Sequence, residues 1–489
     1  MKTIAIIGAG LGGLAAAVLL AAAGNKVDVY ETHSYPGGKM KRYHVGGARF
    51  DFGPNTITMP QVFQSVFERS GADPNDYVQF EQIVDHTNNI FPDGSQFLAS
   101  SNRAKMLQEL ERFNIHSSDY DRYITAVTQL YNHSSNQFFT RSFSSLKEYT
   151  SLRLALAFAS VKPFTKMSQF HSSFFKDERI VQMLNRYATY IGSSPYKTPA
   201  TFSMIGYLEF VQGVYYVKGG NPTIAEAMHR RAKELGVQFY FNKTVKKLKT
   251  ANNEVTSLVC ANNQEKSYDQ FILNGDYTTV YPKLVEKQNR PSFTLDQLVK
   301  EPTSSAFVIL AATSQKTAAS FHHQVYFSQS YEYEFYQLFD EKKYPEDPTI
   351  YICNSSVNDD SAVSHTGGDN LFILVNAPSL TNENRTLDKE QMKEKVYSIL
   401  EQRGVLIRPY LIEDKVVSPK DIEAEFQAYF GGLYGFSSHT TMQAFNRPSS
   451  KTKDFQNLYF AGGSTHPGGG SPMVVQSGIN VANLINNHK

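Results

Sequence analysis

The chain has 489 residues, which is too long for one compact core, so we expect two domains. Lys and Arg number 48 against 46 Asp and Glu, and the resulting net charge of +2 excludes binding to nucleic acid through overall charge. The two cysteines, Cys260 and Cys353, are too few for a disulfide framework or a thiolate metal cage, and a reducing compartment is expected.

The first 30 residues predict a βαβ unit. Thr3–Ile7 is a short, branched, apolar run typical of a buried parallel strand, and Lys26–Tyr30 predicts a second strand. Between them, helix formers occupy residues 14–23 and end at Gly24, a residue type favoured just past a helix. The first strand leads into the helix through Gly8-Ala9-Gly10-Leu11-Gly12-Gly13, which matches the pattern G-x-G-x-x-G.

The glycines of this loop have separate physical roles. Gly8 allows the tight turn, Gly10 lets the backbone approach a pyrophosphate, and Gly13 lets helix and strand pack closely. The helix N-terminus offers N–H groups to phosphates. Glu31 follows the second strand, 18 residues beyond Gly13, where its carboxylate accepts hydrogen bonds from ribose hydroxyls and disfavours a 2′-phosphate. The pattern predicts a dinucleotide site that does not take NADP.

Two other interpretations of the N-terminus are weaker. A glycine-rich loop also occurs without a ligand, but here strand, loop, helix, strand and acid follow in the expected order. Lys2 followed by an alanine-rich run to Ala23 resembles a secretory signal peptide. Because glycines interrupt that run and a strand follows at once, we expect the segment to belong to the fold.

Residues 32–215 contain a glycine-rich part and a helical part. Gly37-Gly38 before Lys39, and the strand-like Phe50–Phe52, are expected to contact the middle of the cofactor. From residue 81 onward glycine is sparse, and helical patterns occupy 103–132, 144–160 and 176–190. The apolar stretch 152–164 has basic flanks; it is either an amphipathic helix in a membrane interface or, more commonly for this pattern, a buried helix of a substrate domain.

Residues 214–273 return to an α/β pattern. Val214–Val217 predicts a strand, and Asn221 and Pro222 are suited to the N-cap and first position of the helix that follows. After that helix, Val237–Phe241 is expected to add a strand to the N-terminal parallel sheet. Further strands are expected at 244–248, 255–260 and 268–273. The cofactor domain would then be discontinuous, with residues 81–215 inserted.

From about 286 to 425 the pattern is mixed. Residues 307–310 and 371–375 predict strands, and 390–402 predicts a helix. The aromatic residues between Tyr331 and Phe339 alternate imperfectly, which is compatible with a sheet that walls a pocket. His322-His323 has no third ligand at useful spacing, so no metal site is expected.

The C-terminal stretch is the second glycine-rich signal. A strand at 457–460 enters a loop with five glycines, and a helical run follows from Met473 to Ile485. This arrangement again presents backbone N–H groups and a helix N-terminus to an electron-rich ligand. His466 lies in the loop, where it could act as a base, although a role in shaping the loop is the stronger interpretation.

These motifs together resemble the carotenoid (phytoene or diapophytoene-type) desaturase family of FAD-dependent, amine-oxidase-like flavoproteins. The resemblance rests on the N-terminal fingerprint with Glu31, on Gly219-Gly220-Asn221-Pro222, on Arg447-Pro448, and on Leu458–Gly463 followed by Thr465-His466-Pro467-Gly468-Gly469-Gly470. It implies an α/β fold in which a Rossmann-like, GR2-type FAD-binding domain holds an inserted mixed α+β substrate domain. Residues 1–80, 216–285 and 426–489 would form the FAD-binding domain, and residues 81–215, the membrane-associated part, and 286–425 the substrate domain.

The resemblance also implies FAD as cofactor and a set of residues that contact it. The adenosine and pyrophosphate would be held by the N-terminal motifs, the adenine by the Val245 backbone, and the isoalloxazine would be bordered by the C-terminal loop and helix. The implied set is Gly8, Gly10, Leu11, Gly12, Gly13, Glu31, Gly38, Lys39, Val245, Gly462, Gly463 and Met473, with His466 as the one candidate catalytic residue.

The activity implied is dehydrogenation of a linear C30 or C40 carotenoid precursor such as diapophytoene or phytoene, with hydride transfer to flavin N5. Alternatives are oxidation of a terminal methyl group, as in diaponeurosporene or diapolycopene oxidation, another amine-oxidase-like activity, or FAD binding without catalysis. The partners would be a hydrophobic polyene and a membrane surface, which the protein would contact peripherally from the cytoplasmic face. No run of 18 apolar residues predicts a bilayer-spanning helix.

Overall fold

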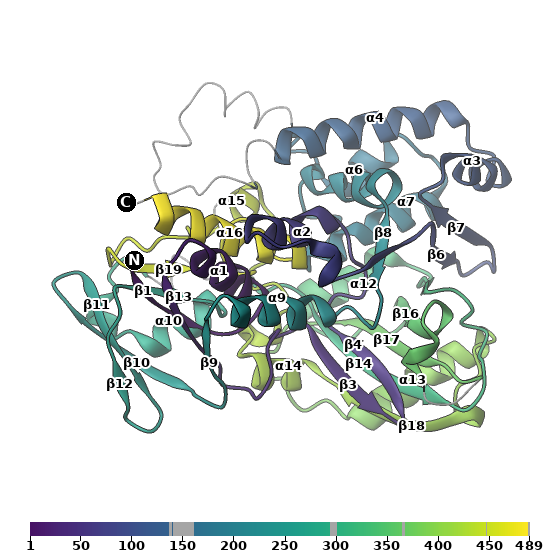
Figure 1. Ribbon diagram of the computed structural model, residues 1–489. Helices are drawn as coiled ribbons and strands as arrows, with labels where there is room; N and C mark the ends of the chain where they lie inside the picture. The colour runs from purple at the N-terminus through teal and green to yellow at the C-terminus, as the bar shows by residue number, and fades with distance from the viewer. Residues whose placement is uncertain (136–138, 140–160, 294–300, 364–366, 446, 488–489) are drawn as a thin grey trace.

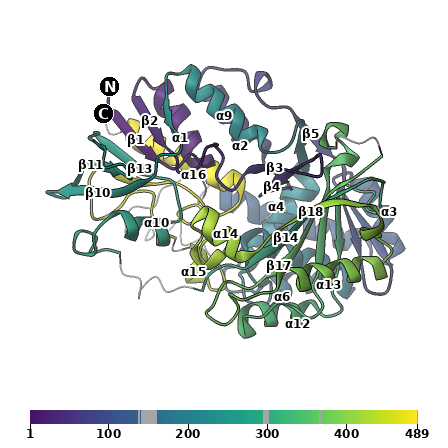
Figure 2. The same ribbon diagram turned by 90° about the horizontal axis from the view of Figure 1, so that it is seen from below.

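The computed structural model describes residues 1–135, 139, 161–293, 301–363, 367–445 and 447–487 (Figure 1). The predicted helix at 144–160, and most of the apolar stretch 152–164, lie outside the described residues. Two sheets organise the chain, one parallel and one mixed, and each has helices packed beside it. The N- and C-terminal ends lie close together beside the parallel sheet (Figures 1 and 2).

The parallel sheet draws its five strands from three distant stretches of the chain. Its order is β19-β13-β1-β2-β9, and all four strand pairs are parallel. The strands are β1 (Thr3–Ile7), β2 (Lys26–Tyr30), β9 (Gln238–Tyr240), β13 (Gln270–Leu273) and β19 (Leu458–Phe460). Because successive side chains of a strand point to opposite faces, Ile4 and Ile6 pack on one side of the sheet and Ala5 on the other.

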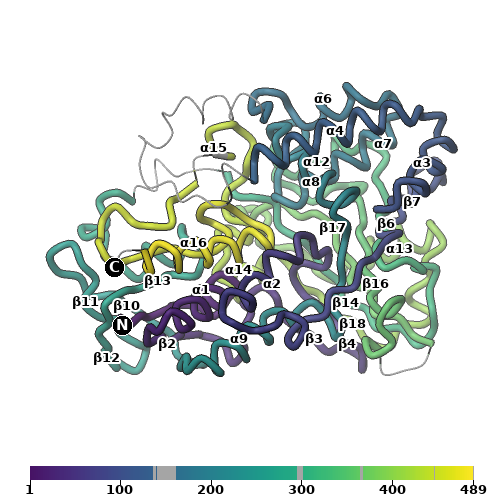
Figure 3. The backbone as a smooth tube through the Cα atoms, turned by 45° about the horizontal axis from the view of Figure 1, so that its top comes forward, coloured from purple at the N-terminus to yellow at the C-terminus, as the bar shows by residue number. Residues whose placement is uncertain are grey.

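Four helices cover the Ile4 and Ile6 face. They are α1 (Leu11–Ala22), α2 (Pro60–Arg69), α9 (Thr223–Glu234) and α16 (Ser471–Asn487). α1 is buried over residues 11–20 and lies beside α16 (Figures 1 and 3). A Cβ at Gly478 of α16 would stand 2.1 Å from the Gly12 carbonyl oxygen, so glycine is required at this crossing. The two helices that follow the two glycine-rich loops are thereby fixed against each other.

The opposite face of the parallel sheet carries smaller elements. An antiparallel sheet of β10 (Val245–Ala251), β11 (Glu254–Cys260) and β12 (Glu265–Lys266) packs there with α10 (Tyr277–Leu284). Two antiparallel strand pairs lie between this part of the molecule and the rest. They are β3 (Lys41–Val45) with β4 (Ala48–Phe52), and β5 (Phe80–Ile83) with β8 (Val214–Val217).

The mixed sheet has seven strands in the order β18-β14-β17-β16-β15-β6-β7. Figure 2 labels three of them, β18, β14 and β17. They are β6 (Asp85–Ile90), β7 (Gln96–Ser100), β14 (Ser305–Thr313), β15 (His323–Tyr326), β16 (Ile350–Asn354), β17 (Asn370–Ala377) and β18 (Leu411–Val417). Ile309 and Ile373 face α13 (Lys389–Gln402), whereas Val308 and Phe372 face β3 and β4 on the other side. α14 (Pro419–Phe426) also packs on the β3–β4 side, through Ile422.

Helices form a layer beside β6 and β7 (Figure 1). They are α3 (Arg103–Arg112), α4 (Ser117–Ser134), α6 (Met167–Ser172), α7 (Glu178–Asn185), α8 (Ile205–Tyr207) and α12 (Tyr331–Tyr336). One more short helix, α15 (Thr441–Phe445), precedes β19 in the sequence. Within the described residues, no helix is both long and apolar enough to cross a membrane.

Several sequence expectations are corrected at the level of single elements. The helix expected at 103–132 is two helices, because the chain turns at Asn114, which adopts φ +55°. The aromatic run from Tyr331 forms helix α12 and a following wide turn, not a sheet. Asn221 does not act as an N-cap, since its amide donates to the carbonyls of Pro54 and Asn55 and its side-chain oxygen accepts from Val217 N–H. The α/β fold itself is as predicted.

Candidate active site

One cavity of about 710 Å³ joins the two sheets. Its lining includes residues of both glycine-rich loops, of strands β14, β16 and β17, and of the helical segment 186–208. Ten of the twelve predicted cofactor residues line it: Gly8, Gly10, Leu11, Glu31, Gly38, Lys39, Val245, Gly462, Gly463 and Met473. Segments more than 400 residues apart in the sequence therefore meet at one site.

The N-terminal loop is held in a conformation that only glycine permits. Gly8 has φ +105°, and a Cβ there would stand 2.3 Å from the carbonyl oxygen of Asn274. Gly8 N–H donates to Tyr30 O at 2.8 Å, and Asn274 Nδ2 donates to Gly8 O at 3.1 Å. The loop is thus fastened to both neighbouring strands before the chain enters α1 at Leu11.

Gly12 and Gly13, the other two predicted residues, have packing roles instead of lining the cavity. A Cβ at Gly13 would lie 2.3 Å from Gly8 O, and one at Gly12 would lie 3.0 Å from Val474 O of α16. Close packing of helix and strand at Gly13 agrees with the role expected for that position.

Glu31 supports the glycine loop from the end of β2. One carboxylate oxygen accepts a hydrogen bond from Ala9 N–H at 2.7 Å, and the other accepts from His33 N–H at 2.9 Å. A carboxylate oxygen has room for a second donor, so these bonds leave Glu31 able to accept from a ribose. Sequence reasoning identified the acid but not its hold on the loop.

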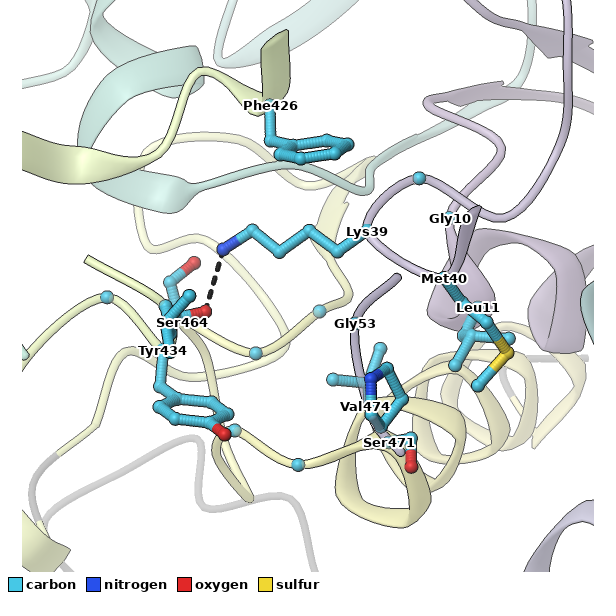
Figure 4. A pocket seen from close by; sticks show the side chains of 18 of the residues that line it. Gly10, Leu11, Lys39, Met40, Gly53, Phe426, Tyr434, Ser464, Ser471 and Val474 are labelled. Atoms are coloured by element: carbon cyan, nitrogen blue, oxygen red, sulfur yellow. Dashed lines mark hydrogen bonds between the residues drawn. The ribbon is translucent and has the colours of Figure 1, made fainter. Parts of the chain in front are cut away.

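Lys39 connects the N-terminal part of the cavity to the C-terminal part. Its Nζ donates to Leu433 O at 2.7 Å, and Figure 4 shows the side chain reaching from the loop beside Gly10 toward the segment that carries Tyr434. Burial lowers the pKa of this amine, an effect that the Asp276 carboxylate opposes. The amine therefore holds two segments together across the cavity.

The C-terminal loop brings backbone to the same cavity. Gly462 has φ +126°, and its N–H donates to Ser477 Oγ at 3.1 Å. A Cβ at Gly469 would lie 2.7 Å from the Tyr434 ring. α16 begins at Ser471 beside this loop, and Ser471 and Val474 face the cavity in Figure 4. The first-turn N–H groups of a helix have no partner within the helix, so this end attracts negative charge.

Arg447 was noted in the sequence but given no role, and the structure supplies one. Its guanidinium donates to Gly463 O at 3.3 Å, Phe436 O at 3.3 Å and Ser438 Oγ at 3.2 Å. Burial lowers the pKa of Arg447 to about 10. The residue lines the cavity and fixes the course of the C-terminal loop.

His466 is buried beside the cavity, and the neighbouring Pro467 and Gly468 contribute to the lining. A cis peptide bond joins His466 to Pro467, and His466 N–H donates to Pro448 O at 2.9 Å. This placement favours the loop-shaping interpretation over a role as base.

The wall opposite the glycine loops is built from apolar side chains. Strands of the mixed sheet and the segment 202–208 supply them together. They are Phe202, Met204, Ile205, Leu208, Ala306, Val308, Phe372 and Leu374. Such a wall excludes water and suits an apolar ligand.

A few polar groups interrupt this wall, and sequence reasoning missed them. Arg186, Tyr190, Tyr351 and Asn376 line the cavity. Asn376 Nδ2 donates to the buried Glu334 carboxylate at 3.2 Å, and burial raises the pKa of Glu334. No sequence motif marks these residues, because helical and strand segments bring them together only in the folded chain.

The structure places a third possible ligand beside His322 and His323. Cys353 pairs with His323 across β15 and β16, and one ligand atom from each residue lies within 4.8 Å of the others. Burial lowers the pKa of His322 to about 4, and burial, together with the neighbouring His322, His86 and Arg186, holds the pKa of His323 well below its ordinary value. Neutral imidazoles suit a metal, but the guanidinium of Arg186 opposes another cation here.

The residues at the glycine end fit FAD. The bare backbone of Gly10 and Gly38 and the N-terminus of α1 suit a pyrophosphate. The N-terminus of α16 suits a negatively charged ring, and Glu31 at the end of β2 suits a ribose. A methyl group at Gly38 would already stand 3.3 Å from the Cα of Gly10, so side chains would narrow this end.

Comparison with known families and proteins agrees with this geometry. The family model described as flavin-containing amine oxidoreductase matches residues 11–486. The 4,4′-diaponeurosporene oxygenase of Staphylococcus aureus (strain MW2) is 30% identical over 99% of this chain and 98% of its own. The 1-hydroxycarotenoid 3,4-desaturase of Flavobacterium sp. (strain P99-3) is 31% identical over 100% of this chain and 99% of its own.

Solved structures share the fold at low sequence identity. An oxidoreductase from Methanosarcina mazei superposes with a TM-score of 0.64 at 15% identity, over 98% of this chain and 99% of the other. Cyclohexylamine oxidase from Brevibacterium oxydans gives a TM-score of 0.62 at 12% identity, over 100% and 99% of the two chains. The cofactor of this fold and family, FAD, is the one that the sequence predicted.

Proposed function

The chain belongs to the family of flavin-containing amine oxidoreductases, and from this premise we propose that it is an FAD-dependent desaturase of linear carotenoids. The substrate would be a C30 or C40 precursor such as diapophytoene or phytoene. One observation carries the proposal: the cavity that begins at the glycine-rich loops continues into an apolar wall suited to a long hydrocarbon.

When bound, FAD supplies a two-electron acceptor for a hydride from an allylic carbon. The chain itself positions the polyene and keeps water away from it. The acids that line the described part of the cavity, Glu31, Asp276 and Glu425, all accept hydrogen bonds from protein groups. Loss of a proton from the carbon next to a delocalised cation needs only a weak base. The main contributions of the cavity lining are therefore to position the polyene and to exclude water.

Substrates of this kind reside in membranes, and we propose that the protein contacts the cytoplasmic face of a membrane peripherally. Phe164 and Met442 are large apolar residues exposed by 83% and 67%. Thr441 Oγ1 donates a hydrogen bond of 2.6 Å to Pro163 O, which joins the two segments, and Ala444, two residues after Met442, lines the cavity. An exposed apolar pair beside the cavity supports substrate entry from the bilayer.

The test is anaerobic reduction of the purified FAD-loaded protein by a linear carotenoid hydrocarbon in detergent. A desaturase bleaches the flavin without oxygen, and its product has two hydrogens fewer and a red-shifted spectrum. Gly10→Val, whose side chain would meet Asn274 at the loop, should lack FAD and serves as the inactive control. Flavin that stays oxidised with every carotenoid offered would contradict the proposal.

A second candidate, oxidation of a terminal methyl group, is favoured by the similarity to the diaponeurosporene oxygenase. That reaction adds oxygen to the product and would give an aldehyde. Turnover under labelled oxygen separates the candidates, because methyl oxidation can place the label in the product, whereas desaturation places none there.

A further inference from the structure

Arg186 is a partly buried arginine at the cavity, and its guanidinium donors are unused. It is the first residue of a short helical segment, Arg186–Ile191, that follows α7, and it lines the cavity on the side of the apolar wall. Its Nε is buried without a hydrogen-bond partner, and among the described residues the guanidinium forms neither a hydrogen bond nor an ion pair.

Arg447 shows how this chain treats a comparable arginine. Both residues line the same cavity, but the Arg447 guanidinium donates to two carbonyls and a hydroxyl of its own loop. The buried Nε of Arg186 has no acceptor, and such a donor is costly because it loses its hydrogen bond to water and gains none in return. The unused donors of Arg186 therefore indicate that an acceptor arrives with a ligand.

The charge of Arg186 is balanced, although its donors are not satisfied. Burial works to lower the pKa of Arg186, but the nearby Tyr190 and Glu209 raise it above its ordinary value, so the group stays protonated. Tyr190 O–H donates to the Glu209 carboxylate, and the Tyr190 ring centre lies 5.6 Å from the guanidinium carbon. With Glu209 already supplying negative charge, an uncharged oxygen acceptor fits this place better than a carboxylate would.

We propose that Arg186 donates a hydrogen bond to a hydroxyl or carbonyl oxygen at one end of the substrate. The chain would then prefer a linear carotenoid that already carries an oxygen at that end over the unsubstituted hydrocarbon. This inference rests on the proposed carotenoid function and shifts its preferred substrate from the hydrocarbon precursor to an oxygen-bearing derivative of it. The oxygen anchors one end of the polyene at the wall, and the rest of the molecule lies along the apolar side chains toward Gly462 and Gly463.

A competition experiment tests the inference with the FAD-loaded protein. Equal amounts of a hydroxylated linear carotenoid and its unsubstituted counterpart are supplied together, and the ratio of their kcat/KM values is measured. The unmodified protein should prefer the hydroxylated compound by about tenfold or more, the range expected for a hydrogen bond to a charged group. Equal use of the two compounds by the unmodified protein would overturn the inference, whether or not any variant folds.

Variants assign the preference to the side chain. Arg186→Met keeps the length and removes the donors, so the ratio should fall close to one, mainly through a higher KM for the hydroxylated compound. Arg186→Lys should restore part of it. The matched control is Arg122→Met, the same change at an exposed arginine of α4, which should keep the original ratio.

The outcomes separate the inference from the function it rests on. If both carotenoids react and Arg186→Met keeps the ratio of the unmodified protein while binding FAD, the role of Arg186 is refuted and the carotenoid function stands. If neither compound reduces the flavin, both proposals fail together.

Discussion

The two ends of the cavity are built by different means. At one end Gly8, Gly10 and Gly462 present backbone, and positive φ angles or close approaches exclude side chains. At the other end the surface consists of side chains from strands and helical segments that are distant in sequence, such as Leu374 and Phe202. The first end is suited to a cofactor with phosphates and the second to a hydrocarbon.

This difference explains which part of the molecule tolerates change. A backbone site depends on a few positions where any Cβ collides with a neighbouring chain segment. A side-chain wall depends on total volume and dryness, which many combinations of apolar residues supply. We therefore expect single substitutions to abolish cofactor binding at one end and to alter selectivity or stability at the other.

The largest effect is expected for Gly8→Ala. The substitution places a Cβ 2.3 Å from Asn274 O at a φ of +105°, so the ends of β1 and β13 must separate. Strain of this kind costs at least about 4 kcal/mol. The purified variant should contain no FAD by absorbance at the flavin bands, and its melting temperature should fall.

Gly24→Ala is the matched control for backbone strain. Gly24 also has a positive φ, +83°, but a Cβ there would meet nothing within 4 Å. Its cost should be about 1 kcal/mol, from the backbone conformation alone, with FAD retained. If Gly8→Ala kept its flavin while Gly24→Ala behaved normally, the collision at Asn274 would not govern cofactor binding.

The contrast between the glycine-rich end and the apolar end of the cavity also explains how much of the structure could be predicted from the sequence. β1 and β2 have the predicted bounds, because local apolar runs and glycines determine them, and β9 joins the parallel sheet as expected. Glu31 was identified from its distance to the glycine loop. Cys353 lies beside His323 only because β15 pairs with β16, and Arg186 reaches the cavity only through tertiary packing, neither of which a single sequence encodes locally.

Helix α12 shows why the side-chain end was the harder one. Its aromatic residues suggested a strand, but Tyr331 and Phe335 are one helical turn apart and both pack into the core of the helical layer. Burial on one helix face, decided by tertiary packing, prevailed over the β-propensity of aromatic residues.

Acid should destabilise the part of the protein that forms the apolar end of the cavity, because this part contains buried histidines. Burial lowers the pKa of His171 and of His322 to about 4, whereas an unfolded histidine titrates near 6.5. Between these values the unfolded chain binds a proton that the folded chain does not, so the free energy of unfolding rises with pH. The contribution of each neutral histidine to the free energy of unfolding is fully present above about pH 6.5. It is lost as the pH falls toward 4, by on the order of 3 kcal/mol for each histidine.

His171→Phe should flatten this dependence. The variant loses the hydrogen bond between His171 Nδ1 and Asn185, 2.9 Å long, so it is less stable at neutral pH, but its stability should change less between pH 6.5 and 4. Chemical unfolding at a series of pH values measures the slope. His133→Phe, at an exposed site on α4, is the control, and equal slopes for the two variants would contradict the assignment to His171.

The smallest effect is expected for Lys39→Met, which acts where the two ends of the chain meet. Removing the bond from Nζ to Leu433 O leaves a buried carbonyl without its charged donor and loosens the segment beside Tyr434. Hydrogen bonds to charged groups contribute about 1.5–3 kcal/mol, so FAD affinity should fall by about tenfold or more without abolishing binding. Lys197→Met removes the same charge from a lysine that pairs with the Asp340 side chain at 2.8 Å, outside the cavity lining, and it should leave FAD affinity within about twofold. Titration of both apoproteins with FAD compares them. If Lys197→Met reduced affinity as much as Lys39→Met, the effect would follow from lost positive charge and not from the connection between the N-terminal loop and the C-terminal segment.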